Sequence, residues 1–195
     1  MKPNIVTVKI SGVAMVNLTR LDRYNISNQL RILEALYPDE AKDFALKREA
    51  IERGYEMLYG WDMDHIYDGD DIMTVEESKE VWDTMDMFDA IDRSLKNLHL
   101  DPNILDGLPL KQFAGYDGNN ETKFMSFAAF TVERLERFTY LPMARKGYWN
   151  SHMPMRPVYQ RMLQVWRQVP SPKSFEMTEQ QVLAVLRAAK HPESR

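Results

Sequence analysis

Acidic side chains are concentrated between residues 61 and 92, where their oxygens could bind a cation. This stretch carries twelve Asp and Glu residues. An EF-hand calcium loop needs oxygen ligands at loop positions 1, 3 and 5, and a Glu at position 12. A loop that begins at Asp64 instead places Ile66 at position 3 and Val75 at position 12. The spacing therefore predicts a solvated acidic loop, and we expect no metal ion and no other cofactor.

The histidines lack the spacing that catalysis or metal binding requires. They stand at positions 65, 99, 152 and 191, and no two share a helical turn, whereas a transition-metal site needs convergent ligands. Arg145 and His152 have six residues between them, a spacing that loosely resembles the Arg–His motif of HEPN ribonucleases. Gly147 and Pro154 favour a loop there, whereas the motif requires a helix. A ribonuclease-like or other hydrolase is therefore kept as an alternative, with no catalytic residue assigned.

Asp92 is a further candidate acid, because helical spacing places it on the apolar face of its helix. A carboxylate there must be paired or protonated, since desolvating its charge is costly. We predict a structural ion pair, to Arg53 or to Arg134. The alternative is an acid whose pKa is raised by a pocket.

Arginine and aromatic side chains are interleaved in the C-terminal third of the chain. This composition can bind the backbone and bases of nucleic acid, and it also dominates protein interfaces. The helical spacing of Tyr159, Met162 and Trp166 favours packing in a core or an interface over ligand binding. The candidates for contact with nucleic acid or a protein partner are Arg137, Arg145, Trp149, His152 and Arg161.

Composition excludes several classes of protein. Without cysteine, the chain has no disulfide, no thiolate zinc site and no cysteine nucleophile. A mean hydropathy of -0.48, with neither a long apolar run nor the apolar core of a signal peptide, predicts a cytoplasmic protein without a membrane span. Residues 123–168 carry eight bases and two acids. We expect this basic segment to meet the acidic one, within one subunit or between subunits.

Residues 4–11 alternate between apolar and polar side chains, which predicts a β-strand. Val6 and Val8 lie on one face, and Thr7 and Lys9 on the other. A lone strand has unpaired backbone groups along both edges, so we expect this one to pair with a second copy of itself in a dimer.

Helical periodicity replaces this alternation from about residue 17. Thr74 and Thr178 are each followed three residues later by Glu or Gln, which predicts the N-caps of two helices. Apolar residues surround most of the helix expected at 120–138, which is therefore predicted to be the buried central helix. The predicted helices span about residues 17–36, 38–59, 74–97, 120–138, 154–167 and 178–189.

The first two predicted helices have apolar side chains through which they could pack. In the first helix these side chains form a stripe at spacings of four and three residues. The expected packing residues are Ile26, Leu30, Leu33 and Leu36 in the first helix, and Phe44, Leu46, Ile51, Tyr55 and Leu58 in the second.

Several short stretches of the chain resemble the YfbU family of uncharacterised bacterial proteins. They are Ser27-Asn28-Gln29, Ile51–Tyr55, Asn97-Leu98, Gly115-Tyr116-Asp117, and Tyr159–Leu163 with Val165-Trp166. The resemblance covers roughly residues 15–187. It implies an all-α fold and a homo-oligomer, and it supplies no catalytic residues, because the family has no established activity.

These observations predict an all-α, multi-helix single domain over residues 17–190, preceded by a strand extension over residues 1–16. The first functional hypothesis is a non-catalytic homo-oligomer that acts through protein–protein interaction. The alternative is a DNA-binding regulator of ribbon-helix-helix type, in which Thr7 and Lys9 face bases and helices at 13–24 and 27–36 follow.

Overall fold

The computed structural model describes residues 16–60, 63, 65–67, 69–100, 102–142, 147–170 and 175–190. Over these residues the chain is helical and contains no β-strand, which confirms the helical class. The strand predicted at residues 4–11 lies outside the described residues. The chain divides into two compact units, one ending at Asp68 and the other beginning at Gly69. The boundary of a single helical domain over residues 17–190 stays a prediction.

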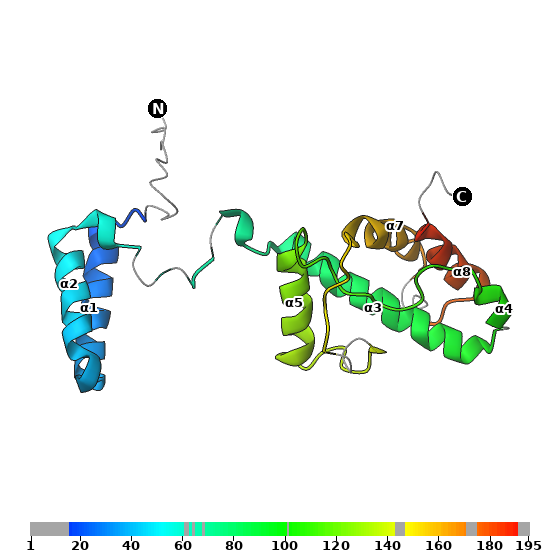
Figure 1. Cartoon of the computed structure of the whole chain (residues 1–195), viewed down its shortest axis with the longest axis horizontal. Coiled ribbons are helices and arrows are strands. Elements are labelled where there is room, and N and C mark those ends of the chain that lie inside the picture. Colours follow the sequence, from blue (N-terminus) through cyan, green and yellow to red (C-terminus); the bar gives the residue numbers. More distant parts are fainter. Residues whose placement is uncertain are drawn as a thin grey trace, which may run out of the picture. The chain divides into compact units, whose positions relative to one another are not determined.

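The first unit is a helical hairpin, made of α1 (Arg20–Leu36) and α2 (Ala41–Arg53), which lie side by side in Figure 1. Thr19 caps α1 through a capping box with Asp22. A 3-10 turn at Pro38–Glu40 joins the helices. The second helix was predicted to reach residue 59, but it ends at Arg53. Gly54 adopts a left-handed φ of +76°, which terminates the helix before a further 3-10 turn at Glu56–Leu58.

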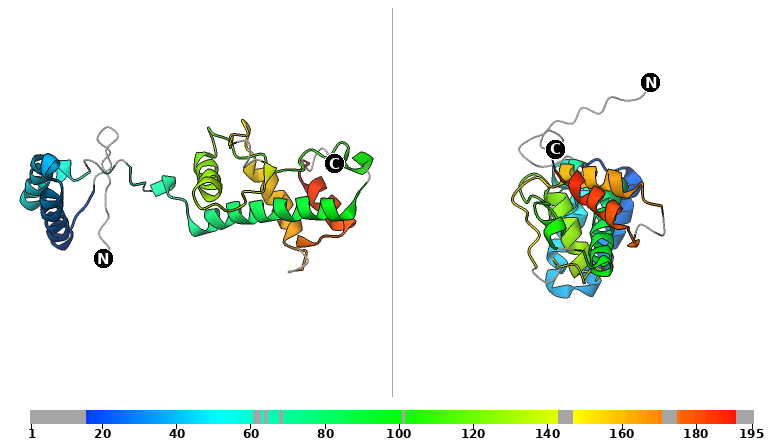
Figure 2. Two further views of the ribbon diagram at one scale, coloured as in Figure 1. Left: turned by 90° about the horizontal axis from the view of Figure 1, so that it is seen from below. Right: turned by 90° about the vertical axis from the view of Figure 1, so that its right-hand side faces the viewer.

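The second unit is built around α3 (Val75–Leu98). Thr74 caps this helix with Glu77, as the sequence predicts. The helices α5 (Thr122–Glu133), α7 (Arg156–Trp166) and α8 (Glu179–Ala188) all contact α3, and Figure 2 shows them along its length. A 3-10 turn at Gly69–Asp71 precedes α3, and a single helical turn, α4 (Pro102–Leu105), follows it. Thr178 caps α8, which confirms the second predicted capping box.

The central helix of this unit is α3, rather than the helix predicted at 120–138. Its Val81, Met85 and Ile91 are fully buried, whereas Phe130 of α5 is 48% exposed. The prediction was wrong because α5 ends at Glu133: Glu136 and Phe138 have left-handed φ values of +54°, which a helix cannot accommodate. The apolar residues after Glu133 therefore belong to a loop.

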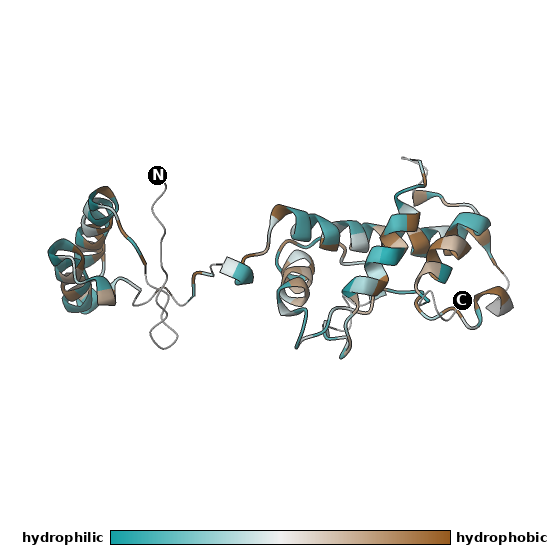
Figure 3. Cartoon of the chain, turned by 90° about the horizontal axis from the view of Figure 1, so that it is seen from above, coloured by the Kyte–Doolittle hydropathy of each residue, from teal (hydrophilic) through white to brown (hydrophobic). Residues whose placement is uncertain are grey.

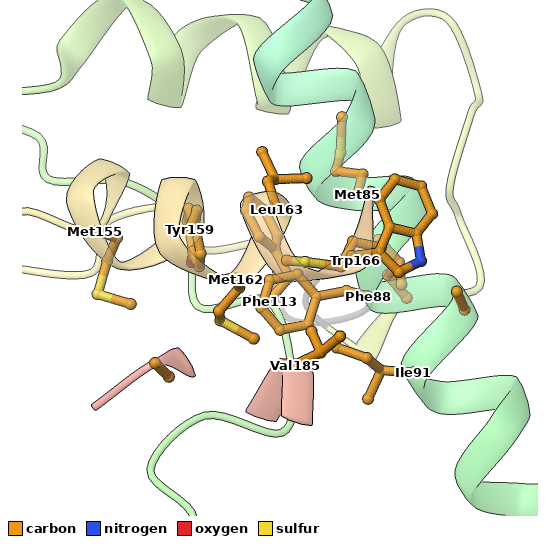
Figure 4. Packing of buried hydrophobic residues seen from close by; sticks show 14 of the residues in the cluster. Met85, Phe88, Ile91, Phe113, Met155, Tyr159, Met162, Leu163, Trp166 and Val185 are labelled. Carbon is orange, nitrogen blue, oxygen red and sulfur yellow. The ribbon is translucent and has the colours of Figure 1, made fainter. Parts of the chain in front are cut away.

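The core of the second unit joins α7 to α3 through aromatic and sulfur-containing side chains. Tyr159 of α7 packs edge-on against Phe88 of α3, with ring centroids 5.5 Å apart. Figure 4 shows Tyr159, Met162 and Trp166 gathered with Met85 and Phe88. Tyr159, Met162 and Trp166 of α7 were predicted to serve packing, and their burial in this core confirms it.

A pair of backbone hydrogen bonds joins the segment before α5 to the segment before α7. The N–H of Tyr116 donates to the carbonyl of Trp149, and the N–H of Ser151 donates to the carbonyl of Tyr116, both at 3.0 Å. The Tyr159 hydroxyl donates to the carbonyl of Gly115 at 2.8 Å and so anchors the same segment from α7. Among the described residues, none of the helices is both long enough and apolar enough to cross a membrane.

Candidate functional site

Three carboxylates of α3, spaced three residues apart, each bind a base from another element of the same unit. The pairs are Glu77 with Lys123, Glu80 with Arg156, and Asp83 with Arg167, at N···O distances of 2.9, 2.7 and 2.7 Å. The expectation that the acidic and basic segments meet is therefore confirmed for these pairs, within one chain. Each of the three bases is thus paired with a carboxylate of its own chain.

Arg156 is the most constrained of these bases. Its Nε and Nη2 donate to the two oxygens of Glu80 at 2.7 and 3.2 Å, a bidentate geometry. Its guanidinium lies 4.3 Å from the ring centre of Phe124. The hydrogen bond to Glu80 raises the pKa of Arg156 further above its ordinary value. Arg156 thus fastens α7 to α3 and α5.

Glu121 is a buried carboxylate that the sequence analysis did not single out. It accepts the backbone N–H groups of Met155 at 3.0 Å, Arg156 at 2.7 Å and Asp117 at 3.0 Å. The first turn of a helix is a natural anion site, and here the chain's own Glu121 occupies the N-terminus of α7. No sequence pattern signals this contact, because Glu121 and Arg156 are 35 residues apart.

Two of the candidate binding residues have structural contacts. Arg161 donates to the carbonyls of Ala188 at 3.2 Å and Ala189 at 2.9 Å, so it caps the C-terminus of α8. Trp149 is 8% exposed, and its indole N–H donates to Glu133 at 2.6 Å.

The remaining candidates do not converge with these two. Arg137 is exposed in the loop after α5. His152 is exposed, has a left-handed φ of +58°, and bonds the Tyr148 hydroxyl through its ring. Thr7, Lys9 and Arg145 lie outside the described residues. The described candidates therefore form no single cluster.

On α3, the ion-pair partner of Asp92 differs from the predicted one. Asp92 pairs with Lys96 at 2.5 Å, one turn along its own helix, rather than with Arg53 or Arg134. Asp89, three residues earlier, is 3% exposed and pairs with Arg93 at 2.9 Å. Asp89 is buried because α3 is packed on most of its circumference, so few of its residues face solvent.

Asp86 lies half-buried on the same helix. Burial is the main cause that raises its pKa to about 6, and the charges of Asp83 and Asp89 raise it further, against the opposing effect of Lys79. Within the part of the chain that the structure describes, no hydrogen bond or ion pair reaches the Asp86 carboxyl.

The two helices of the hairpin are joined by a polar network. The Ser27 hydroxyl of α1 donates to Glu52 of α2 at 2.6 Å, and Arg31 donates to the same carboxylate at 3.0 Å. Arg48 of α2 binds Glu34 of α1 at 2.6 Å. Ser27 and Glu52 belong to two of the short stretches that were quoted for the family resemblance.

The opposite side of α1 is apolar and faces solvent. We define the outer face of α1 as Leu21, Tyr24, Asn28, Ile32 and Leu36, which recur at helical spacing. Its four large apolar side chains are 67%, 65%, 58% and 65% exposed in chain order. Hydrophobic stretches on the hairpin are visible as brown ribbon in Figure 3. These four side chains have no packing partner among the described residues.

Three predictions about the hairpin were wrong. Leu36 belongs to the outer face, whereas it was predicted to share one apolar stripe with Ile26, Leu30 and Leu33. Leu46 and Tyr55, predicted packing residues of the second helix, are 59% and 48% exposed. The signal that sequence analysis missed is the second apolar stripe of α1, which runs through Leu21 and Ile32 on the side opposite Leu30.

Surface hollows in the described part of the chain lie away from the predicted acids. One of about 300 Å³ borders the outer face of α1 and is lined in part by Arg23, Tyr24 and Asn28. Another of about 410 Å³ lies along α2, and a third of about 430 Å³ lies beside Phe175. Neither Asp92 nor His152 lines any of the three. The same described residues contain no group of three or more acidic or histidine side chains placed to hold a metal ion.

Comparison with known proteins identifies both a domain family and individual relatives. The model of the YfbU domain matches residues 16–188, which span both units. UPF0304 protein MJECS11 of Methanocaldococcus jannaschii is 28% identical over 173 residues, covering 88% of this chain and 99% of the relative. The strand predicted at residues 4–11 precedes the region that the domain model matches.

Proposed function

The chain belongs to the YfbU family, and we propose that it acts without catalysis, as a cytoplasmic homo-oligomer that assembles through its N-terminal hairpin. The observation that supports this function is the exposed outer face of α1. Monomeric soluble proteins rarely leave contiguous apolar patches uncovered, and such patches mark interaction sites.

The hairpin also buries too little apolar surface to be stable by itself. Among its described residues the buried hydrophobic side chains are Ala50, Ile51 and Tyr59. Units this small usually need disulfides, metals or oligomerisation, and the chain has no cysteine. Covering a large apolar side chain contributes roughly 1.5–3 kcal/mol when burial is complete. The four large side chains of the outer face therefore offer a substantial gain to an oligomer.

The arrangement of charge favours the same function over ligand binding. The bases that made the C-terminal third a candidate binding patch include Arg156, Arg161 and Arg167, and each binds a carboxylate or a carbonyl of its own chain. The outer face of α1, by contrast, presents four large exposed apolar side chains.

The DNA-binding alternative stays a prediction. Thr7 and Lys9 lie outside the described residues. That alternative assumed a break between helices at residues 24–27, whereas α1 runs unbroken from Arg20 to Leu36.

The experiment is to measure molar mass by light scattering after size exclusion. The full chain is expected at a multiple of 22.9 kDa. Ile32→Glu places a charge on the outer face and is expected to lower the mass to that of one chain. Val75→Glu is the matched control, because Val75 is 79% exposed at the start of α3, where a carboxylate suits the helix dipole. A wild-type chain that is monomeric at micromolar concentration contradicts the proposal.

A chain without residues 1–16 separates this interface from the predicted strand. If the hairpin drives assembly, the truncated protein keeps the same number of subunits as the full chain. Loss of assembly in the truncated protein, with Ile32→Glu unaffected, would instead assign assembly to the N-terminal segment.

A further inference from the structure

The outer face of α1 is arranged symmetrically about Asn28. This residue is the midpoint of α1, which spans residues 20–36. Tyr24 and Ile32 lie four residues before and after it, and Leu21 and Ala35 lie seven residues before and after it. Residues four and seven apart share a face of a helix. A half-turn about an axis through Asn28 therefore exchanges the positions of this face, except that Leu36 takes Arg20 as its counterpart eight residues before Asn28.

The same face carries no charge. The charged residues of α1 are Arg20, Asp22, Arg23, Arg31 and Glu34. They lie outside the row formed by Leu21, Asn28 and Ile32, and Arg31 and Glu34 are bound to α2. Two copies of this face can therefore meet without bringing like charges together.

From this symmetry we propose that the occupant of the outer face is α1 of a second copy of the chain, packed antiparallel across a two-fold axis at Asn28. The proposal rests on the function proposed above and specifies its geometry. Tyr24 packs against Ile32 of the partner subunit. Leu21 packs against the partner subunit's Ala35 and Leu36, and the two Asn28 side chains meet on the axis. In a closed two-fold interface both subunits contribute the same patch, which here is the outer face of α1.

Charge at the two ends of α1 favours the antiparallel direction over the parallel one. Arg20 and Arg23 outnumber Asp22 in the first turn, whereas the exposed Asp39 and Glu40 follow the last turn. Antiparallel packing brings each basic end beside the acidic end of the partner and opposes the two helix dipoles. Parallel packing would place the basic ends together.

Single cysteines can test this geometry directly, because the natural chain has none. A disulfide requires Cα atoms about 4.4–6.8 Å apart. Residues that face each other on helices whose axes are about 8–10 Å apart meet this condition. Asn28→Cys on the axis can therefore cross-link two identical chains. The two copies of Leu21 would be about 21 Å apart along the axis, because each lies seven residues from Asn28.

The experiment is to oxidise each full-length variant and to resolve it on a non-reducing gel. Asn28→Cys is expected to become mostly dimeric, and Leu21→Cys is expected to stay monomeric on the gel. An equimolar mixture of Tyr24→Cys and Ile32→Cys chains should give a mixed dimer, and neither should cross-link alone. This second pair tests the same geometry if Asn28→Cys does not fold, as judged by far-ultraviolet circular dichroism.

Two results would overturn the proposed geometry. Cross-linking of Leu21→Cys alone, together with Asn28→Cys, would identify parallel packing. Absence of cross-links at every position, in a protein that light scattering finds oligomeric, would reject the two-fold interface and leave the proposed function intact. A wild-type chain that is monomeric by light scattering would reject the proposed function itself.

Discussion

Gly115 lies so close to Trp149 that a Cβ atom on the glycine would stand 2.1 Å from the tryptophan carbonyl oxygen. Gly115 also has a left-handed φ of +83°, which side-chain-bearing residues rarely adopt. The contact lies beside the paired backbones of Tyr116 and Trp149. Only glycine satisfies both the conformation and the space at this position.

Gly115→Ala is expected to destabilise the second unit by about 3 kcal/mol or more, because it combines an unfavourable φ with a collision against backbone. Gly147→Ala is the matched control: its φ is +61°, but the described residues, apart from its chain neighbours, place no atom within 4 Å of the added Cβ. We expect that control to cost about 1 kcal/mol. Urea unfolding, monitored by circular dichroism, measures the free energy of unfolding of both variants. Equal losses would contradict the expected collision between the added Cβ at position 115 and the Trp149 backbone.

Arg161→Ala is expected to lower the free energy of unfolding by about 1–3 kcal/mol, because it removes the cap of α8 and leaves the carbonyls of Ala188 and Ala189 without their donor. Arg137→Ala is the control, since Arg137 is exposed and its side chain has no such role. That variant should stay within about 0.5 kcal/mol of the wild type. Thermal unfolding measures the stability of both variants. Equal stabilities would contradict the role of Arg161 as the cap of α8.

Asp86→Asn is expected to stabilise the second unit at pH 7.5 and to have less effect at pH 5. The pKa of Asp86 is raised to about 6 in the folded protein, above its ordinary value of 3.8. Stability linked to this proton is therefore present below the ordinary value and is lost as pH rises through about 6. Because Asp86 is only partly buried and solvent screens its charge, we expect a gain on the order of 1 kcal/mol. Unfolding curves at the two pH values measure the difference, and a pH-independent gain would contradict it.

Glu52→Gln is expected to make the hairpin less sensitive to acid. The Ser27 hydroxyl, followed by Arg31, lowers the pKa of Glu52 below its ordinary value of 4.5. A lowered carboxyl pKa gives stability that is present above the ordinary value and is lost as pH falls through the folded value. Wild-type protein should therefore lose more helical signal than the variant when the pH falls below about 4.5. Parallel loss in the two proteins would show that other groups control the transition.

Features that depend on neighbouring residues were predictable from the sequence. The caps at Thr74 and Thr178 were identified because Glu77 and Gln181 stand three residues later. The cap at Thr19 uses Asp22 in the same way, but Asp is a weaker signal than Glu or Gln at that position. The start of α1 was accordingly placed three residues too early.

Features that depend on which side of a helix is covered were less predictable. Both sides of α1 carry apolar side chains, so spacing alone assigned Leu36 to the wrong stripe. The length of α5 was overestimated because Leu135 and Phe138 continue an apolar pattern that the backbone at Glu136 interrupts. The spacing of apolar side chains indicates a helix, but it does not show where the backbone leaves the helical conformation.

For contacts between distant segments, the sequence predicted only that acidic and basic segments would meet, and not which residues would pair. The meeting of acidic and basic segments followed from composition, but the pairing of Glu80 with Arg156 did not. Nothing local marks Glu121 as the cap of α7 or Arg161 as the cap of α8, because their partners lie 35 and about 27 residues away. These assignments required the folded chain.

The row of paired carboxylates on α3 also has a consequence for the order of events during synthesis. Arg156 and Arg167 follow their partners by 76 and 84 residues. When α3 leaves the ribosome, Glu80 therefore lacks its partner Arg156, and Asp83 has only Lys79 of its own helix. These two ion pairs to α7 and its C-terminal end can form only once α7 has been translated. A nascent chain halted before α7 should therefore remain open to proteases.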